Sequence, residues 1–191
     1  VSVLLLLDLS ESLNDIVEAT NQTILELSQE AVSLLAWSVE QLGDNFAIAG
    51  FNSNTREQVM YYHIKGYSEH WDDTVKARLA NLKAEYSTRM GAAIRHGTHY
   101  LDLQKSDKKL MLILTDGEPS DVDVKDSEML IKDAHKAVQE CQQKGMYPYC
   151  ISLDNKADNY VSDIFGSHYS VIDKIESLPK ELPQLFLSLT K

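Results

Sequence analysis

The 191-residue sequence is poor in several features, and each shortage excludes a class of protein. Its two cysteines, Cys141 and Cys150, are too few for a disulfide framework and lack zinc-site spacing, so we expect ordinary thiols in a reducing, cytoplasmic setting. Eighteen basic residues against 29 acidic ones give a net charge of −11, which disfavours nucleic acid as a partner. No stretch approaches the ~18 apolar residues of a membrane span, so we expect none.

Signatures of common catalytic sites are also missing. There is no Gly-x-x-x-x-Gly-Lys phosphate loop, so any ATP hydrolysis must come from another chain. Neither Ser10 nor Ser12 stands in a Gly-x-Ser-x-Gly turn. His96 and His99 could share a helix face, but no third nitrogen or sulfur ligand follows at a suitable spacing. We therefore interpret these histidines as packing or surface residues.

What the sequence does contain is an alternation of apolar, strand-length runs with stretches of helical period, which is typical of an α/β fold. With 43% hydrophobic residues, we expect one domain over 1–191, with a mostly parallel six-stranded sheet and helices on both faces. The expected strands are 3–7, 46–51, 58–64, 110–114, 147–153 and 169–172. The expected helices are 22–42, 73–82, 90–103, 127–144, 159–165 and 182–189. The strand over 58–64 follows its predecessor closely, which predicts a hairpin and an antiparallel edge.

Oxygen-bearing side chains follow the first apolar run. Asp8, Ser10 and Ser12 occupy alternate positions, which extended backbone would send toward one side. Such ligands suit Mg²⁺ or Mn²⁺ better than zinc, although Ser and Asp also abound in ordinary turns. A second apolar run ends in Asp116-Gly117. Parallel sheets bind ligands beyond the carboxyl ends of their strands, where both carboxylates are expected.

A divalent cation takes about six oxygen ligands, more than two strand ends supply. The best candidate for a third contributor is Thr88, in a loop that leads into an expected helix. Gly91 would allow a close approach of the backbone there. The alternative is that Thr88 only caps the helix.

Together, Asp8-x-Ser10-x-Ser12, Thr88 and Asp116-Gly117 resemble the metal-ion-dependent adhesion site of von Willebrand factor A (VWA) domains. The resemblance covers the whole chain and implies the doubly wound VWA fold. It implies that the three hydroxyls bind Mg²⁺, with Mn²⁺ or Ca²⁺ as further options, and that the two aspartates hold the ion directly or through water. One coordination position would be left for an acidic residue of a partner protein.

Three longer segments, 43–51, 86–96 and 114–124, resemble the C-terminal domain of bacterial NorD and CbbO proteins. This resemblance implies the C-terminal part of a longer protein, which a buried strand at the very first residues also favours. It further implies a MoxR-type AAA+ ATPase as partner. The pair would activate or remodel a client enzyme, nitric oxide reductase for NorD or Rubisco for CbbO, and the motifs do not choose between the two.

More residues are expected in a second shell or at the rim of the metal site. They are Glu11, Gly91, Gly117, Glu118 and Asp121. The acidic ones, together with Asp123, could hold an arginine or lysine at the rim of the same interface, or could be solvated loop acids.

We therefore expect a divalent-metal-dependent protein-recognition module that is not an enzyme. One alternative is a metal-dependent phosphohydrolase, since haloacid dehalogenase enzymes also place an Asp and a metal after the first strand. Those enzymes need a second Asp two residues later as acid and base, and here that position is Ser10. The other alternative is a structural brace with an empty metal site.

Overall fold

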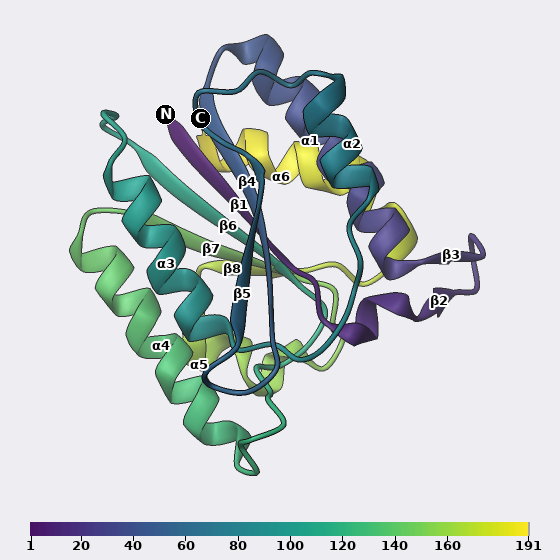
Figure 1. Ribbon diagram of the computed structural model, residues 1–191, viewed down its shortest axis with the longest axis vertical. Coiled ribbons are helices and arrows are strands. Elements are labelled where there is room, and N and C mark those ends of the chain that lie inside the picture. Colours follow the sequence, from purple (N-terminus) through teal and green to yellow (C-terminus); the bar gives the residue numbers. More distant parts are fainter. Residues whose placement is uncertain (191) are drawn as a thin grey trace.

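A six-stranded sheet forms the centre of the fold in the computed structural model, which describes residues 1–190 (Figure 1). The strand order is β5-β4-β1-β6-β7-β8. All neighbouring strands are parallel except β5, which runs antiparallel to β4. The strands are β1 (Ser2–Asp8), β4 (Asn45–Ser53), β5 (Val59–Lys65), β6 (Lys109–Thr115), β7 (Tyr147–Ser152) and β8 (Tyr169–Val171). The predicted parallel sheet with one antiparallel edge strand is confirmed.

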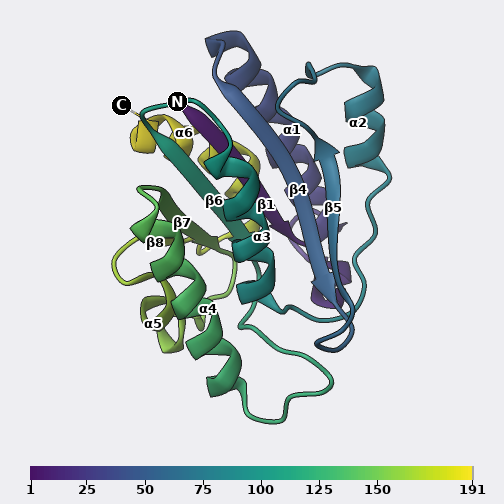
Figure 2. The same ribbon diagram turned by 60° about the vertical axis from the view of Figure 1, so that its left-hand side comes forward.

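Helices cover both faces of this sheet, as Figures 1 and 2 show. One face packs against α1 and α6, and the other against α3, α4 and α5. The α-helices are α1 (Ile24–Leu42), α2 (Asp73–Ala80), α3 (Met90–Asp102), α4 (Ser127–Gln143), α5 (Val161–Phe165) and α6 (Leu178–Thr190). The short 3-10 helices are η1 (Glu11–Asn14), η2 (Ala157–Asn159) and η3 (Ile175–Ser177). Within residues 1–190, no helix combines the length and apolar character needed to cross a membrane.

Strand β1 is central because it is apolar on both sides. Leu5 and Leu7 face the core beneath α1 and α6, whereas Leu4 and Leu6 face the core beneath α3 and α4. All four are at most 4% exposed. Burying a leucine side chain stabilises a fold by roughly 1.5–3 kcal/mol, so this run strongly favours a doubly covered, parallel strand. The strand therefore delivers its last residue, Asp8, to the carboxyl edge of the sheet.

The first long helix begins later than the predicted 22–42, because its expected first residues belong to an unpredicted hairpin. The hairpin pairs β2 (Ile16–Val17) with β3 (Gln22–Thr23). The Thr23 hydroxyl accepts from the Glu26 N–H, and the Glu26 carboxylate accepts from the Thr23 N–H, so the helix starts at Ile24. Gly43, with φ of 76°, ends the helix in the left-handed conformation that glycine adopts readily.

The last helix also differs from its prediction, 182–189, and begins at Leu178. Pro179 stands in its first turn, where the missing N–H removes no helical hydrogen bond. A second proline, Pro183, lies inside this helix. The predicted start at 182 places Pro183 in the first turn, where proline is tolerated best, and therefore begins the helix too late.

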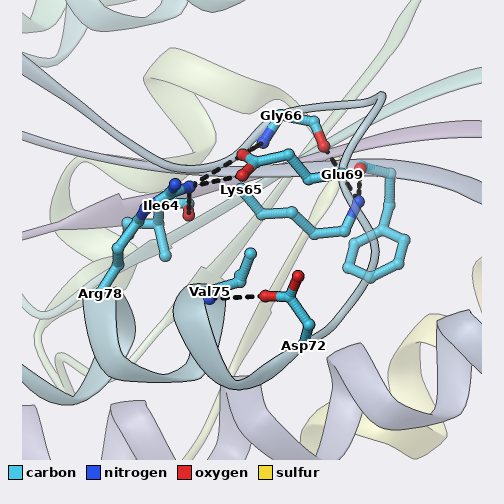
Figure 3. Close-up of polar contacts among 8 residues, drawn as sticks. Ile64, Lys65, Gly66, Glu69, Asp72, Val75 and Arg78 are labelled. Carbon is cyan, nitrogen blue, oxygen red and sulfur yellow. Dashed lines mark hydrogen bonds and ion pairs between the residues drawn. The ribbon is translucent and has the colours of Figure 1, made fainter.

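At the end of the sheet where β1 and β4 begin, polar contacts hold the turn from β5 to α2 (Figure 3). Lys65 is 2% exposed, and its Nζ donates to the carbonyls of Phe46 at 2.8 Å and Gly66 at 3.0 Å. The Glu69 carboxylate accepts from the Gly66 N–H at 2.9 Å and from Arg78 Nη1 at 2.8 Å. These contacts fix the edge strand at the end of the sheet opposite Asp8.

Candidate metal centre

Asp8 is buried at the carboxyl edge of the sheet, with 2% of its surface exposed. Its Oδ1 accepts from the Ser10 N–H at 2.9 Å, and its Oδ2 accepts from the Thr115 hydroxyl at 2.7 Å. The Thr88 hydroxyl lies 3.3 Å from Oδ1 and 3.4 Å from Oδ2. Burial raises the pKa of Asp8 more than these hydrogen bonds lower it. The hydroxyls around this carboxylate thus compensate only part of the cost of burying its charge.

The Ser10 hydroxyl lies beside Asp8, and its oxygen is 3.3 Å from the Ser12 hydroxyl oxygen. Ser10 has extended backbone, with φ of −71° and ψ of 162°. Ser12 lies in η1, so a 3-10 turn and not the expected strand alternation brings its hydroxyl back to Ser10. The two serines do meet, but the extended backbone predicted at Ser12 is not what the structure contains.

Thr88 lies in the loop between α2 and α3 and is 4% exposed. It does not cap α3, because the N-cap residue is Arg89 and no side chain bonds to that helix start. Its backbone N–H donates to the Ser120 carbonyl at 3.0 Å, and its carbonyl accepts from the Ser120 N–H at 2.8 Å. This pairing joins the Thr88 loop to the loop after β6 and leaves the Thr88 hydroxyl facing Asp8.

Asp116 follows β6, the strand adjacent to β1. Its Oδ1 is buried and has no hydrogen-bond partner within the described residues. Burial, and after it the charge of Asp8, raises the pKa of Asp116 to about 7, against a smaller opposing effect of a hydrogen bond from Ser12. The two neighbouring carboxyl groups therefore repel each other when both are ionised, and the surrounding hydroxyls supply no positive charge that would offset this repulsion.

The oxygens gathered here fit a hard divalent cation. Hydrogen bonds connect the five predicted ligands into one cluster, which consists of Asp8, Ser10, Ser12, Thr88 and Asp116. A divalent ion would balance the two carboxylate charges and give the unpartnered Asp116 Oδ1 a ligand role. Within residues 1–190, no group of three or more His, Cys, Asp or Glu side chains is placed to hold a metal, so any ion here depends on the hydroxyls.

Thr115 belongs to none of the predicted site residues, although its hydroxyl donates the shortest hydrogen bond given above for Asp8. The same hydroxyl oxygen accepts from the Gly117 N–H at 3.4 Å. The contact depends on the register of the parallel pairing, in which Leu7 lies opposite Leu114, so one further step brings Thr115 beside Asp8. Thr115 therefore helps to orient the Asp8 carboxylate.

The predicted rim residues have different surroundings. Glu11 and Glu118 are exposed at the carboxyl edge of the sheet. Gly91 serves helix packing, because a Cβ at this position would collide with Asp133 of α4. A Cβ at Gly117 would meet open space, so that glycine is not required by crowding.

Asp121 and Asp123 are not available to an arginine or lysine of a partner protein, because both already form ion pairs with Arg89 of the same chain. Arg89 Nε lies 3.0 Å from Asp121 Oδ2, and Arg89 Nη2 lies 2.5 Å from Asp123 Oδ1. The Asp121 side chain is completely buried, and that of Arg89 is 11% exposed. Burial acts to raise the pKa of Asp121, yet hydrogen bonds from its neighbours hold that pKa below its ordinary value. Asp121 is therefore not free to hold an arginine or lysine of another protein.

Comparisons with known proteins agree with this architecture. The family model for the von Willebrand factor type A domain matches residues 2–182. Protein NorD of Brucella melitensis biotype 1 is 35% identical over 189 residues, which cover 98% of this chain and 30% of that protein. Protein NorD of Stutzerimonas stutzeri is 35% identical over 170 residues, covering 88% and 28%. The chain thus spans less than a third of these curated relatives.

Solved structures show the same fold at low sequence identity. The PilB minor pilin from Streptococcus sanguinis has a TM-score of 0.77 at 15% identity, covering 98% of this chain and 60% of that one. A von Willebrand factor type A structure from Catenulispora acidiphila has a TM-score of 0.65 at 17% identity, covering 96% and 41%. With the family model matching nearly the whole sequence, this chain belongs to the von Willebrand factor type A domain family.

Proposed function

We propose that this domain is a divalent-metal-dependent protein-recognition module. Its VWA family membership and its NorD-named relatives support a protein-interaction module. The observation that carries the metal dependence is the buried, unpartnered Oδ1 of Asp116 beside a second buried carboxylate, Asp8. Such a pair is costly without a cation and favourable with one.

In this proposal, Asp8 and Asp116 hold the ion directly or through water, and the hydroxyls of Ser10, Ser12 and Thr88 complete the protein's share of ligands. The bound ion, preferably Mg²⁺, would supply an electrophilic centre for a carboxylate on a partner protein. Two protein carboxylates match the ion's two positive charges, so a further carboxylate is still attracted by the ion itself. The chain's own contribution is to hold these oxygens in place and to keep Asp8 and the Oδ1 of Asp116 buried.

The test is calorimetric titration with Mg²⁺ and Mn²⁺ of wild type and of a T88A/D116A double variant. We expect saturable binding by wild type and loss of binding in the double variant. Thr98→Ala is a matched control, because the hydroxyl of this buried threonine donates to the Ile94 carbonyl within α3 and not to the cluster around Asp8, so the variant should bind as wild type does.

Other outcomes would favour the alternatives. Hydrolysis of a generic phosphomonoester that is lost in Asp8→Asn would favour a metal-dependent phosphohydrolase. If wild type binds neither ion, the metal-dependent function is refuted and a structural brace becomes the better explanation.

We further propose that the domain belongs to an adaptor that works with a MoxR-type AAA+ ATPase on a client enzyme. The support is the resemblance of three segments to NorD and CbbO proteins, and the 35% identity to proteins named NorD favours the NorD-like form over the CbbO-like one. The relevant test is co-purification of the full-length protein with such an ATPase, with and without Mg²⁺. Capture of the client, but not of the ATPase, should be lost in Asp116→Ala if the metal site binds the client.

A further inference from the structure

Arg89 joins three loops around the candidate metal centre. Its two ion pairs reach Asp121 at 3.0 Å and Asp123 at 2.5 Å, both in the loop after β6. The same two carboxylates accept backbone N–H groups from the β4–β5 loop: Asp121 Oδ1 from Thr55 at 2.8 Å, and Asp123 Oδ2 from Arg56 at 2.8 Å. One guanidinium therefore holds the carboxylates that tie the β4–β5 loop, the Thr88 loop and the loop after β6 together.

These contacts form a closed ring next to the metal ligands. Thr88 and Arg89 are adjacent in the chain, Arg89 binds Asp121, Asp121 is adjacent to Ser120, and Ser120 pairs with the Thr88 backbone. A ring of covalent bonds and short hydrogen bonds allows its members little independent movement. Here it fixes a segment that carries one ligand, Thr88, relative to the loop that begins with another, Asp116.

Resting on the proposed function, we propose that Arg89 is a positioning residue for the metal site. It does not touch the ion, but it holds the Thr88 hydroxyl and the Asp116 loop in the arrangement that binds Mg²⁺. Outer residues that orient metal ligands typically contribute 10- to 100-fold in metal affinity. The planar, two-armed guanidinium is suited to the task because it serves two carboxylates at once.

Considered as a charge alone, Arg89 should weaken Mg²⁺ binding, so electrostatics predicts that its removal raises the affinity. Arg89 is a cation near a cation-binding site, so its replacement by a neutral residue would reduce repulsion and would also leave Asp121 without its counter-ion. On electrostatic grounds, Arg89→Gln should therefore bind Mg²⁺ more tightly. If Arg89 positions the ligands, the same variant should bind Mg²⁺ more weakly, so the direction of the change separates the two explanations.

The Arg89→Lys variant separates the effect of the two-armed guanidinium geometry from the effect of the positive charge. Lysine keeps the positive charge, but a single ammonium group cannot reproduce the paired contacts of Nε and Nη2. Arg95→Gln is the matched control, because Arg95 of α3 also pairs with two carboxylates, through Nη1 to Asp133 at 2.9 Å and through Nε to Glu140 at 3.0 Å. Both partners of Arg95 belong to α4 and not to the metal-site loops.

The experiment is Mg²⁺ titration by calorimetry of wild type, Arg89→Gln, Arg89→Lys and Arg95→Gln, with urea unfolding in EDTA to identify folded variants. We expect affinity to fall roughly 10- to 100-fold in Arg89→Gln, to fall less in Arg89→Lys, and to stay within about twofold of wild type in Arg95→Gln. Unchanged or tighter binding by folded Arg89→Gln overturns the inference and leaves the proposed function intact. If Arg89→Gln does not fold, Arg89→Lys decides, since wild-type affinity in that variant overturns the inference equally. Failure of wild type to bind would instead refute the proposed function.

Discussion

Replacing Asp116 by asparagine isolates the electrostatic cost of placing two carboxylates at the metal centre. Asparagine keeps the shape of the side chain but carries no charge, so it resembles the protonated form of Asp116. In wild type, burial and the charge of Asp8 raise the pKa of Asp116 from its ordinary value of 3.8 to about 7. The folded domain therefore holds a proton at pH values where the unfolded chain has released it.

The size of the effect follows from this difference. A change from 3.8 to about 7 is about 3 pH units, and each unit corresponds to about 1.36 kcal/mol, which gives an upper limit of about 4 kcal/mol. Asp116 is only partly buried, and solvent screens part of this cost, so we expect about 1–3 kcal/mol. Because the folded state binds the extra proton, the stability of the metal-free domain falls as pH rises from about 4 to about 7.

The assay is urea unfolding at pH 5, 6, 7 and 8 in the presence of EDTA. Wild type should lose about 1–3 kcal/mol of unfolding free energy across this range relative to Asp116→Asn, and the variant should be the more stable protein at pH 8. Saturating Mg²⁺ should restore the unfolding free energy of wild type at pH 8 and leave that of the variant unchanged, because only a folded site with both carboxylates charged binds the ion.

Parallel pH profiles of the two proteins in EDTA would refute this reasoning, because they would show that Asp116 ionises normally in the folded domain. A profile in which wild type gains stability relative to the variant as pH rises would refute it more strongly. In that case the surrounding hydroxyls would already satisfy both carboxylates, and the argument for a required cation would fail.

Three further substitutions test the local geometry. Thr115→Val removes the hydroxyl that donates to Asp8 at 2.7 Å and should lower the unfolding free energy in urea by about 1–3 kcal/mol; unchanged stability would show that this hydrogen bond is not needed. Gly91→Ala should also destabilise by about 1–3 kcal/mol, because its new methyl group meets Asp133, while Gly117→Ala should stay within about 0.5 kcal/mol of wild type. Equal urea midpoints for these two alanine variants would contradict the packing argument.

The sequence predicted most of the fold because the patterns involved are local. An apolar run without alternation marked β1 as a doubly covered strand, and the same pattern marked β6. The unpredicted hairpin of β2 and β3 has only two residues in each strand, too few to show a period. The start of α6 at Leu178 was not predicted because Pro183 lies inside this helix, whereas proline is usually tolerated only in a first turn.

The residue types at the strand ends can be read directly from the sequence: Asp8 with its two serines, and Asp116 before a glycine. Their chemistry depends on contacts that form only in the folded chain, since Thr115 bonds to Asp8 across 107 positions and Arg89 reaches Asp121 across 32. The raised pKa of Asp116 likewise comes from burial and from a charge on another strand. Burial, repulsion and hydrogen bonds depend on distances in space, and those distances exist only once the chain has folded.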